Sequence, residues 1–348
     1  MLNSQQISLP IFVGISLLTT TSLLYYLYVK NQKKFVNVCK INKLFIYPIK
    51  AAKGVEVDHL EVTKYGVKYK ELRDRSWILL DKNNYYLQLK DEPRLALTQC
   101  SIEGQELWVN APNMPTLKLR YIKHLNKDHQ LVMFKMYNQE MKGINCGPEV
   151  NQWFELYFGR PGVRLIQHHP DLNYRTSNSH KRSTEDHKYP VIFQNKSTLH
   201  LVNERSIDDL NTYISTGAES LKQENFRPNI LISYPEAWAE DQWKWMQINR
   251  ALFKRYLLCN RCPNITVNQD TGVKDMESLI ALNKFRPPTG INKKKGCGPN
   301  FGVIFGYISS GIIHVGNDVD VMYASDNKSR QYIPVIANVW YRLYTRQR

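Results

Sequence analysis

Cysteine is scarce in this chain, with six cysteines in 348 residues. This count excludes the disulfide framework of small secreted proteins and fits a reducing compartment such as the cytosol. Acidic residues are outnumbered, with 31 Asp and Glu against 47 Lys and Arg, so the formal net charge is +16. Such a balance favours anionic partners: nucleic acids, acidic membranes, acidic proteins or phosphorylated cofactors. No compact basic arm or nucleic-acid-binding signature is present, so we expect no nucleic-acid binding.

The N-terminal segment lacks charge, with no Lys, Arg, Asp or Glu from Leu2 to Val29. Its apolar part, residues 7–29, is long enough at about 1.5 Å per residue to cross a hydrocarbon core of about 30 Å. Tyrosines at its far end and lysines directly after it are typical of an interfacial belt and a cytosolic flank. A cleaved signal peptide is the alternative, but the basic start and small-residue cleavage site are missing.

We therefore expect residues 1–38 to be an uncleaved signal anchor, with one transmembrane helix, and a basic linker. The main domain would then face the cytosol from the mitochondrial outer membrane. The endoplasmic reticulum or the peroxisome membrane is the alternative, because moderate hydrophobicity with basic flanks suits more than one organelle.

The first half of the soluble part is predicted to be mainly β-structure. Residues 40–57 read as strand, turn and strand, and further β-like runs follow at 77–80, 85–89, 95–100 and 107–110. Short runs separated by turn residues indicate a β-barrel or a strongly bent sheet. One helix is clear, because Gly147 and Pro148 mark a start, Trp153 to Phe158 continue an apolar stripe, and Gly159 marks an end.

The second half mixes strands and helices. Residues 171–189 are polar without apolar periodicity, which predicts an exposed loop. Three histidines lie in or near this loop: His169, His180 and His187. Each stands alone, without the further ligands that a metal site needs. A second domain is expected to begin near residue 191, with a helix at 206–214 capped by Ser206, a helix at 275–285, and hairpin strands within 303–323.

Cys262 is the strongest candidate for a reactive side chain, because it lies beside Arg261 in a polar run that follows two further basic residues. Neighbouring cations stabilise a thiolate, which attacks electrophiles and binds soft or high-valent metals. Three other interpretations stay open from the residues alone. Cys262 could be a small buried apolar residue, or form with Cys259 half of a zinc site or a redox dithiol.

Five segments together resemble the MOSC-domain proteins, and among them the amidoxime-reducing components of mitochondria. The match runs in order from about Lys40 to Tyr323. The segments are Tyr47-Pro48-Ile49-Lys50-Ala51-Ala52-Lys53-Gly54, Leu72-Arg73-Asp74-Arg75-Ser76-Trp77, Glu92-Pro93-Arg94-Leu95, Asn225-Phe226-Arg227-Pro228-Asn229-Ile230, and Arg261-Cys262 with Asp270-Thr271-Gly272.

The resemblance implies a β-rich α+β fold, with an N-terminal MOSC-associated β-barrel region at residues 39–165 and a MOSC β-barrel domain at 171–340. It also implies a molybdenum-molybdopterin cofactor with Cys262 as catalytic residue and molybdenum ligand. By the same resemblance, the residues that contact the cofactor are Lys50, Arg75, Ser197, Arg227, Asn229, Asn260, Arg261 and Cys262. The arginines in this set suit a phosphorylated cofactor, because guanidinium groups bind phosphate with paired hydrogen bonds.

The activity that the resemblance implies is reduction of N-hydroxylated compounds such as amidoximes, with electrons from cytochrome b5 and NADH-cytochrome b5 reductase. One alternative is a sulfur carrier with Cys262 as persulfide, although molybdenum cofactor sulfurases carry a pyridoxal-phosphate domain for which this chain has no room. Another is a non-catalytic anchored protein. The chain departs from the family pattern at Ala51, Ala52, Lys196 and Asn260, and a basic loop around residues 293–295 is its own.

Overall fold

The computed structural model describes residues 35–177, 189–215, 219–288 and 297–323. The expected anchor, His180, His187 and the basic loop at 293–295 lie outside these residues. Within the described ranges, no helix is both long and apolar enough to cross a membrane. The described residues from Asn37 onward belong to one compact unit. The division into domains at 39–165 and 171–340 stays a prediction.

A closed seven-stranded barrel forms the centre of the fold. Its strands, in spatial order, are β16 (Ile230–Ile232), β15 (Leu199–Asn203), β19 (Asn300–Ser309), β18 (Ala251–Asn260), β17 (Trp243–Ile248), β21 (Asp318–Tyr323) and β1 (Val36–Ile46). The barrel closes where β1 pairs antiparallel with β16, with Ile41 opposite Ile232. β1 also pairs with β2 (Val55–Val57), which confirms the strand, turn and strand expected at 40–57.

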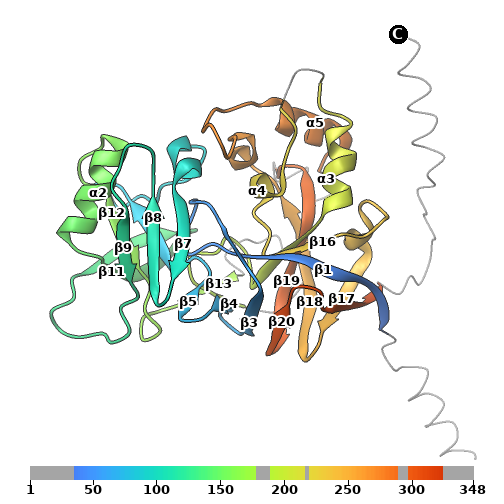
Figure 1. The fold of residues 1–348 in the computed structure, drawn as a ribbon, viewed down its shortest axis with the longest axis horizontal. Coiled ribbons are helices and arrows are strands. Elements are labelled where there is room, and N and C mark those ends of the chain that lie inside the picture. Colours follow the sequence, from blue (N-terminus) through green and yellow to red (C-terminus); the bar gives the residue numbers. More distant parts are fainter. Residues whose placement is uncertain (1–34, 178–188, 216–218, 289–296, 324–348) are drawn as a thin grey trace, which may run out of the picture. The chain divides into compact units, whose positions relative to one another are not determined.

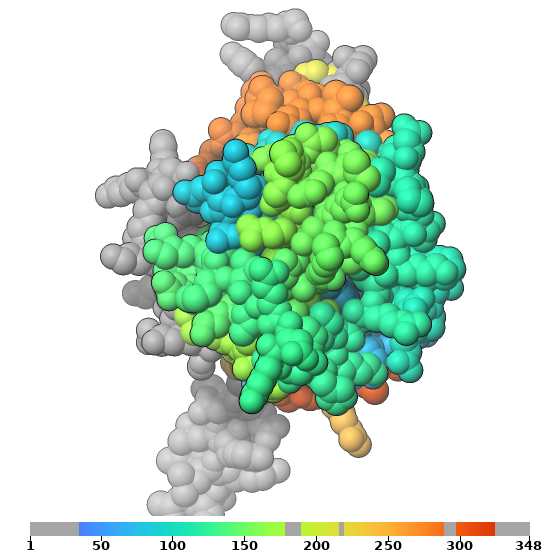
Figure 2. Space-filling view, turned by 90° about the vertical axis from the view of Figure 1, so that its left-hand side faces the viewer, coloured from blue at the N-terminus to red at the C-terminus, as the bar shows by residue number. Residues whose placement is uncertain are grey.

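The barrel is accompanied by smaller antiparallel sheets, which come mostly from the N-terminal part of the chain and lie mainly to the left of strands β17 to β19 in Figure 1. Their strands are β3 (His59–Thr63), β4 (Gly66–Tyr69), β5 (Leu72–Arg73), β6 (Trp77–Leu80), β7 (Gln99–Glu103), β8 (Glu106–Asn110), β9 (Leu117–Arg120), β10 (Leu131–Met136), β11 (Gln139–Asn145), β12 (Arg164–Gln167), β13 (Arg175–Thr176), β14 (Pro190–Val191) and β20 (Gly311–His314). Residues of this part, teal to green, cover most of the face seen in Figure 2.

The helices are short and lie at the ends of strands. They are α2 (Pro148–Phe158), α3 (Glu204–Asn211), α4 (Gln223–Phe226) and α5 (Glu277–Phe285), with 3-10 turns η1 (Pro93–Leu97), η3 (Ala239–Gln242) and η4 (Pro263–Thr266). The helix expected after Gly147 is confirmed as α2, which ends at Gly159 in the left-handed conformation and buries Trp153 and Phe154. Glycine suits such an end because it has no Cβ to clash.

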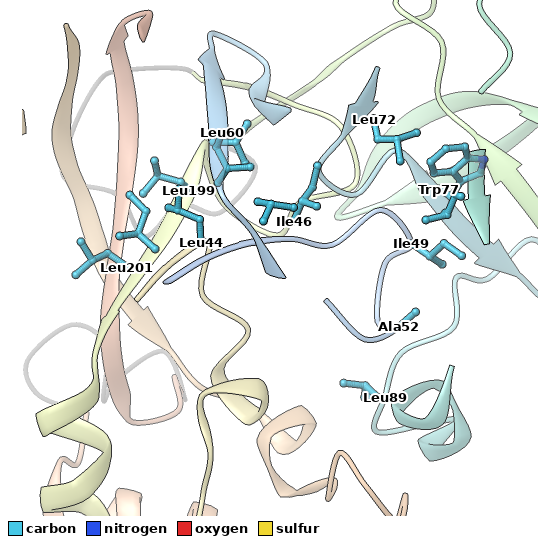
Figure 3. Packing of buried hydrophobic residues seen from close by; sticks show 14 of the residues in the cluster. Leu44, Ile46, Ile49, Ala52, Leu60, Leu72, Trp77, Leu89, Leu199 and Leu201 are labelled. Atoms are coloured by element: carbon cyan, nitrogen blue, oxygen red, sulfur yellow. The ribbon is translucent and has the colours of Figure 1, made fainter. Parts of the chain in front are cut away.

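One hydrophobic core joins the barrel to the N-terminal sheets. Figure 3 shows it running from Leu201 of β15 through Leu44 of β1 to Ile49 and Trp77. Leu44 and Ile49 are fully buried and Trp77 is 1% exposed. Because burial of each large apolar side chain contributes about 1.5–3 kcal/mol, this continuous packing fixes the loop after β1 against β6. That loop carries Lys50, so the core fixes the position of the Lys50 backbone.

Two predicted strands in the first half are wrong. Residues 95–100 were expected to be extended, but Pro93 to Leu97 form the 3-10 turn η1 and β7 begins at Gln99. Pro93 lies at the start of the turn, where its fixed φ favours helical geometry. Residues 85–89 do not form a strand either, since Tyr86 makes only an isolated bridge with Leu80.

Three expectations in the second half are also corrected. α3 begins earlier than expected and is capped by Asn203, because the Ser206 hydroxyl instead donates to the buried Glu240. β20 does not pair with β19 in a hairpin; it pairs with β3, and Gly311 permits this departure by lying against the Ala251 backbone. The segment before residue 178 is only partly exposed: Asp171, Asn173 and Thr176 are exposed as expected, but Arg175 is 1% exposed and pairs with Val191 of β14.

Candidate functional site

All eight residues expected at the site line one cavity of about 150 Å³. They come from the loops before or after strands β1, β6, β15, β16 and β18. We call this space the basic cavity, because five cationic side chains line it with a single carboxylate, that of Asp74. The cations are Lys50, Arg75, Lys196, Arg227 and Arg261.

Lys50 lies in the loop between β1 and β2, and its backbone donates to Trp77 O at 2.8 Å. Its side chain is 8% exposed and its ammonium donates to Phe193 O at 2.9 Å. Burial, followed by the charges of Arg175, Arg75 and Arg227, holds the pKa of Lys50 well below its ordinary value. An anion in the cavity would reverse this effect by favouring the charged ammonium.

Asp74 organises the neighbouring cation and amide. This carboxylate is fully buried, pairs with Arg75 at 2.5 Å and accepts from Asn229 Nδ2 at 3.2 Å. It also accepts from the Tyr47 backbone N–H at 3.0 Å. Arg75 has a positive φ of 52°, an uncommon backbone conformation for a residue with a side chain. Asp74 therefore fixes the direction in which Arg75 and Asn229 point.

The ring of Tyr47 contacts two guanidinium groups, those of Arg75 and Arg227. The Arg75 and Arg227 carbons lie 4.3 Å and 4.4 Å from the centre of its ring. Cation–π contacts of this kind contribute about 0.5–2 kcal/mol, with the larger values at desolvated sites. Gly54 permits the arrangement, because a Cβ there would lie 2.5 Å from the Tyr47 ring.

Arg227 has donor capacity that the protein does not use. It ends α4 in the left-handed conformation, and its Nη1 donates weakly to Ala51 O at 3.5 Å. Its Nη2 is buried and has no hydrogen-bond partner among the described residues. Burial and then the charge of Arg75 lower the pKa of Arg227 to about 10, so it stays cationic at neutral pH. The buried Ser197 hydroxyl has no partner among the described residues either.

Arg261 is occupied by the protein itself. It is 9% exposed, and its guanidinium donates to Phe301 O at 2.7 and 2.9 Å and to Phe226 O at 3.0 Å. Its Nη2 also lies 2.7 Å from Nε2 of His200. Burial and then Arg261 hold the pKa of His200 well below its usual range, so the neutral ring accepts this hydrogen bond. These contacts make Arg261 a support for the Cys262 loop.

The two cysteines of the Cys259-x-x-Cys262 pair have different surroundings. Cys262 is exposed and directly precedes η4. Cys259 is half-buried and packs against an apolar cluster that contains Tyr189, Tyr256 and Ile304. Both cysteines line the basic cavity, and Cys262 is the more exposed of the two, so a ligand there reaches its sulfur more readily. Among the described residues, no three His, Cys, Asp or Glu side chains converge as a metal site.

Asn260 and Lys196, two of the departures from the family pattern, form a pair at the cavity wall. Lys196 Nζ donates to Asn260 Oδ1 at 3.3 Å, and Asn260 Nδ2 donates to Asn300 Oδ1 at 2.7 Å. Ala51 adopts a positive φ of 74° and Ala52 is fully buried. The asparagine thus keeps a polar wall where the family pattern has a hydroxyl.

Comparison with known proteins supports the resemblance to the MOSC-domain family. The MOSC N-terminal β-barrel domain matches residues 38–161 and the MOSC domain matches residues 188–320. The chain is 33% identical to mitochondrial amidoxime reducing component 2 of Rattus norvegicus over 83% of this chain and 85% of that protein. The chain belongs to the amidoxime-reducing component family of MOSC proteins.

Other members of the family agree with that assignment. The human mitochondrial amidoxime reducing component 2 is 32% identical over 83% of this chain and 85% of that protein. Mitochondrial amidoxime-reducing component 1 of Danio rerio is 30% identical over 85% of this chain and 89% of that protein. The β-rich α+β fold expected from the family is confirmed by the closed barrel.

Sequence reasoning missed the residues that hold the site together. Asp74 and Tyr47 stand inside the segments that carry the family resemblance, but neither was assigned a role. A lone acidic residue between two arginines in the run Arg73-Asp74-Arg75 is a signal that one of them is paired. His169 is not a ligand, because its Nε2 lies 3.0 Å from Lys123 O and its ring is 3% exposed.

Proposed function

We propose that this chain is a molybdenum-cofactor-dependent reductase that removes the oxygen of N-hydroxylated compounds, such as amidoximes, as water. The observation that carries the proposal is the crowding of buried and half-buried cations in the cavity that also contains the exposed thiol of Cys262. Burial and the neighbouring arginines lower the pKa of Lys50, and burial and Arg75 lower that of Arg227, while Asp74 is the one carboxylate among the residues that line the cavity. Perturbed groups in a cavity of this kind mark functional sites more often than structural ones.

A multiply anionic ligand fits the basic cavity. It would supply negative charge beside Lys50 and Arg227, which have no ion pair among the described residues, and its oxygens would accept hydrogen bonds from Arg227 Nη2 and Ser197 Oγ, which have no partner there either. Leaving such buried donors without acceptors costs about 1–3 kcal/mol each. The phosphate of molybdopterin has the charge and the acceptor oxygens that these side chains require.

The exposed thiol fits the remaining part of the cofactor. Cys262 can provide one thiolate to a metal, and soft thiolate ligands suit a metal already held by sulfur. When bound, the molybdenum cofactor supplies two-electron redox chemistry that no side chain of this protein can supply. In this proposal Cys262 anchors the metal, Lys50, Arg75, Arg227 and Ser197 orient the phosphate, and Asp74 orients Arg75.

The partners and the location follow from the family and are part of the proposal. Relatives are named mitochondrial components, and we place this chain at the mitochondrial outer membrane through residues 1–38. Cytochrome b5 and NADH-cytochrome b5 reductase are proposed as the electron donors. The net charge of +16 favours docking of an acidic partner.

The proposal is tested by comparing the two neighbouring cysteines. Benzamidoxime reduction, with dithionite as electron source, should be abolished by Cys262→Ala and largely kept by Cys259→Ser. The reason is that Cys259, although it also lines the cavity, packs against an apolar cluster, whereas Cys262 is exposed. Full activity of Cys262→Ala would contradict the assignment. Equal loss in both variants would instead favour a dithiol, and transfer of sulfur from Cys262 without any reduction would favour the sulfur carrier.

A further inference from the structure

A second cavity, of about 300 Å³, lies next to the basic cavity. Asn225 and Ile265 line both. Its walls come from the loop after β1, the segment before α4, and the segment from η4 to α5. Its volume is at the lower end of small-molecule sites, which span about 300–1,000 Å³. We call it the acidic cavity, because its lining has five carboxylate residues and two lysines in a protein that is otherwise strongly basic.

Most of these carboxylates are not neutralised by the protein. Both lysines, Lys53 and Lys222, pair with the same residue, Asp270, at 3.2 and 2.8 Å. Three other lining residues, Glu219, Glu224 and Asp275, have no ion pair among the described residues. The five carboxylates outnumber the two lysines, so the lining of the cavity is net negative and favours a cation.

Two buried acceptors in the wall have no donor. Gln269 is 5% exposed; its Nε2 donates to Val267 O at 3.0 Å, while its buried Oε1 accepts no hydrogen bond from the described residues. Glu224 accepts from Gln223 at one oxygen, and its buried Oε2 has no donor among those residues either. An unmet acceptor of this kind costs about 1–3 kcal/mol. A ligand with N–H donors would recover that free energy.

The shape of the site favours an organic cation over a metal ion. The carboxylates do not converge, since the described residues contain no group of three or more that could hold a metal. Phe45, Leu221 and Ile265 add apolar wall. A planar, delocalised cation with several N–H donors can meet spread acceptors and bury an apolar body at the same time.

We propose that the acidic cavity binds small organic cations of the amidinium or guanidinium class. The binding stands on the cavity alone. Its link to catalysis rests on the proposed function: reduction of an amidoxime yields an amidine, which is protonated at neutral pH. The acidic cavity beside the basic cavity attracts that cation, so the acidic cavity would be the product site.

The test is calorimetric titration of the full-length holoprotein in non-ionic detergent with benzamidine, and with benzamide as the neutral analogue of the same shape. We expect benzamidine to bind at least tenfold more tightly than benzamide. Glu224→Gln and Gln269→Leu should each weaken benzamidine binding about tenfold, as loss of a charge-assisted or buried hydrogen bond does. Glu71→Gln removes the same charge from an exposed position outside the cavity and should leave affinity unchanged.

Three results would overturn the proposal: no benzamidine binding, equal affinity for benzamide, or equal effects of Glu224→Gln and Glu71→Gln. Displacement of benzamidine by calcium ions at micromolar concentration would mean a metal site instead. Thermal melts identify any variant that fails to fold, and Asp275→Asn then replaces it. Because the titration needs no electron donor, an inactive protein that binds benzamidine keeps the cavity proposal and loses only its link to the reaction.

Discussion

Each of the two neighbouring cavities contains a carboxylate paired with a cation, but the pair is buried in one cavity and exposed in the other. In the basic cavity, Asp74 is fully buried and its partner Arg75 has a side chain 15% exposed. In the acidic cavity, Asp270 is 53% exposed, with Lys53 and Lys222 at 23% and 55%. A buried carboxylate that loses its charge leaves cations stranded in low dielectric, whereas an exposed one is replaced by water and salt. The first pair therefore determines structure, and the second mainly sets the local field.

Asp74→Asn is expected to have the largest effect. It leaves Arg75 without a counter-charge beside Arg227, and breaking a buried pair of this kind costs about 3–5 kcal/mol. Urea unfolding should show a lower free energy of unfolding by that amount, and Arg75 and Asn229 should lose their fixed positions. The matched variant Asp128→Asn, at an exposed site, should change little. Similar stability of the two variants would mean that the buried pair does not organise the basic cavity.

Arg227→Ala is expected to weaken cofactor retention. Loss of a charge-assisted contact costs about 1.5–3 kcal/mol, which corresponds to a tenfold to 150-fold increase in the rate of cofactor loss or in its dissociation constant. Dialysis followed by pterin fluorescence measures this change. Arg205→Ala removes an equal charge from a side chain 60% exposed on α3 and should retain the cofactor. Equal loss in both variants would mean that overall charge, not the cavity, holds it.

The lowered pKa of Lys50 predicts how the free energy of unfolding depends on pH. Burial and the neighbouring Arg175, Arg75 and Arg227 lower its folded-state pKa, so between that value and about 10.4 the unfolded chain binds the extra proton. Stability relative to Lys50→Met should therefore rise with pH in this window, by at most about 1.4 kcal/mol per pH unit.

Urea unfolding from about pH 7 to pH 9.5 measures this difference, with exposed Lys135→Met as the control. Added inorganic phosphate should flatten the slope, because an anion in the basic cavity favours the protonated ammonium. A slope shared by both variants, or one that phosphate does not change, would contradict an anion site at Lys50.

Asp270→Asn is expected to have the smallest effect. Hydrogen bonds from Lys222 and then Lys53 lower the pKa of Asp270, so its contribution is present at neutral pH and is lost as pH falls through that lowered value. Exposure and salt screening limit the contribution to about 0.2–1 kcal/mol. Thermal unfolding at low and high salt tests this expectation. A loss as large as that of Asp74→Asn would remove the contrast between the cavities.

The cofactor-site residues could be predicted because they stand in short segments whose residue order is itself the signal. Lys50, Arg75, Arg227 and Cys262 lie far apart in the sequence, yet all line the basic cavity. Their roles stay a prediction, as do the anchor and the electron donors. Arg261 shows the limit of a motif, since the structure commits its guanidinium to backbone carbonyls and His200.

What could not be predicted depends on long-range packing. The acidic cavity brings Tyr47, Glu224 and Gln269 together from three segments, and no local pattern marks Glu224 or Gln269. β20 pairs with β3 and not with a barrel strand. This pairing goes with the close backbone approach at Gly311, which strand propensity does not predict. Ser206 has the spacing of a helix cap, but its hydroxyl donates to the buried carboxylate of Glu240 instead.

The most direct test of the central claim is the metal and pterin content of the full-length protein. The protein is purified from cells that make the molybdenum cofactor and analysed by mass spectrometry of the metal and fluorescence of the oxidised pterin. The account predicts near-stoichiometric molybdenum with a phosphate-bearing pterin, and loss of molybdenum in Cys262→Ala. Wild-type protein without molybdenum, from cells whose other molybdenum proteins are loaded, would contradict it.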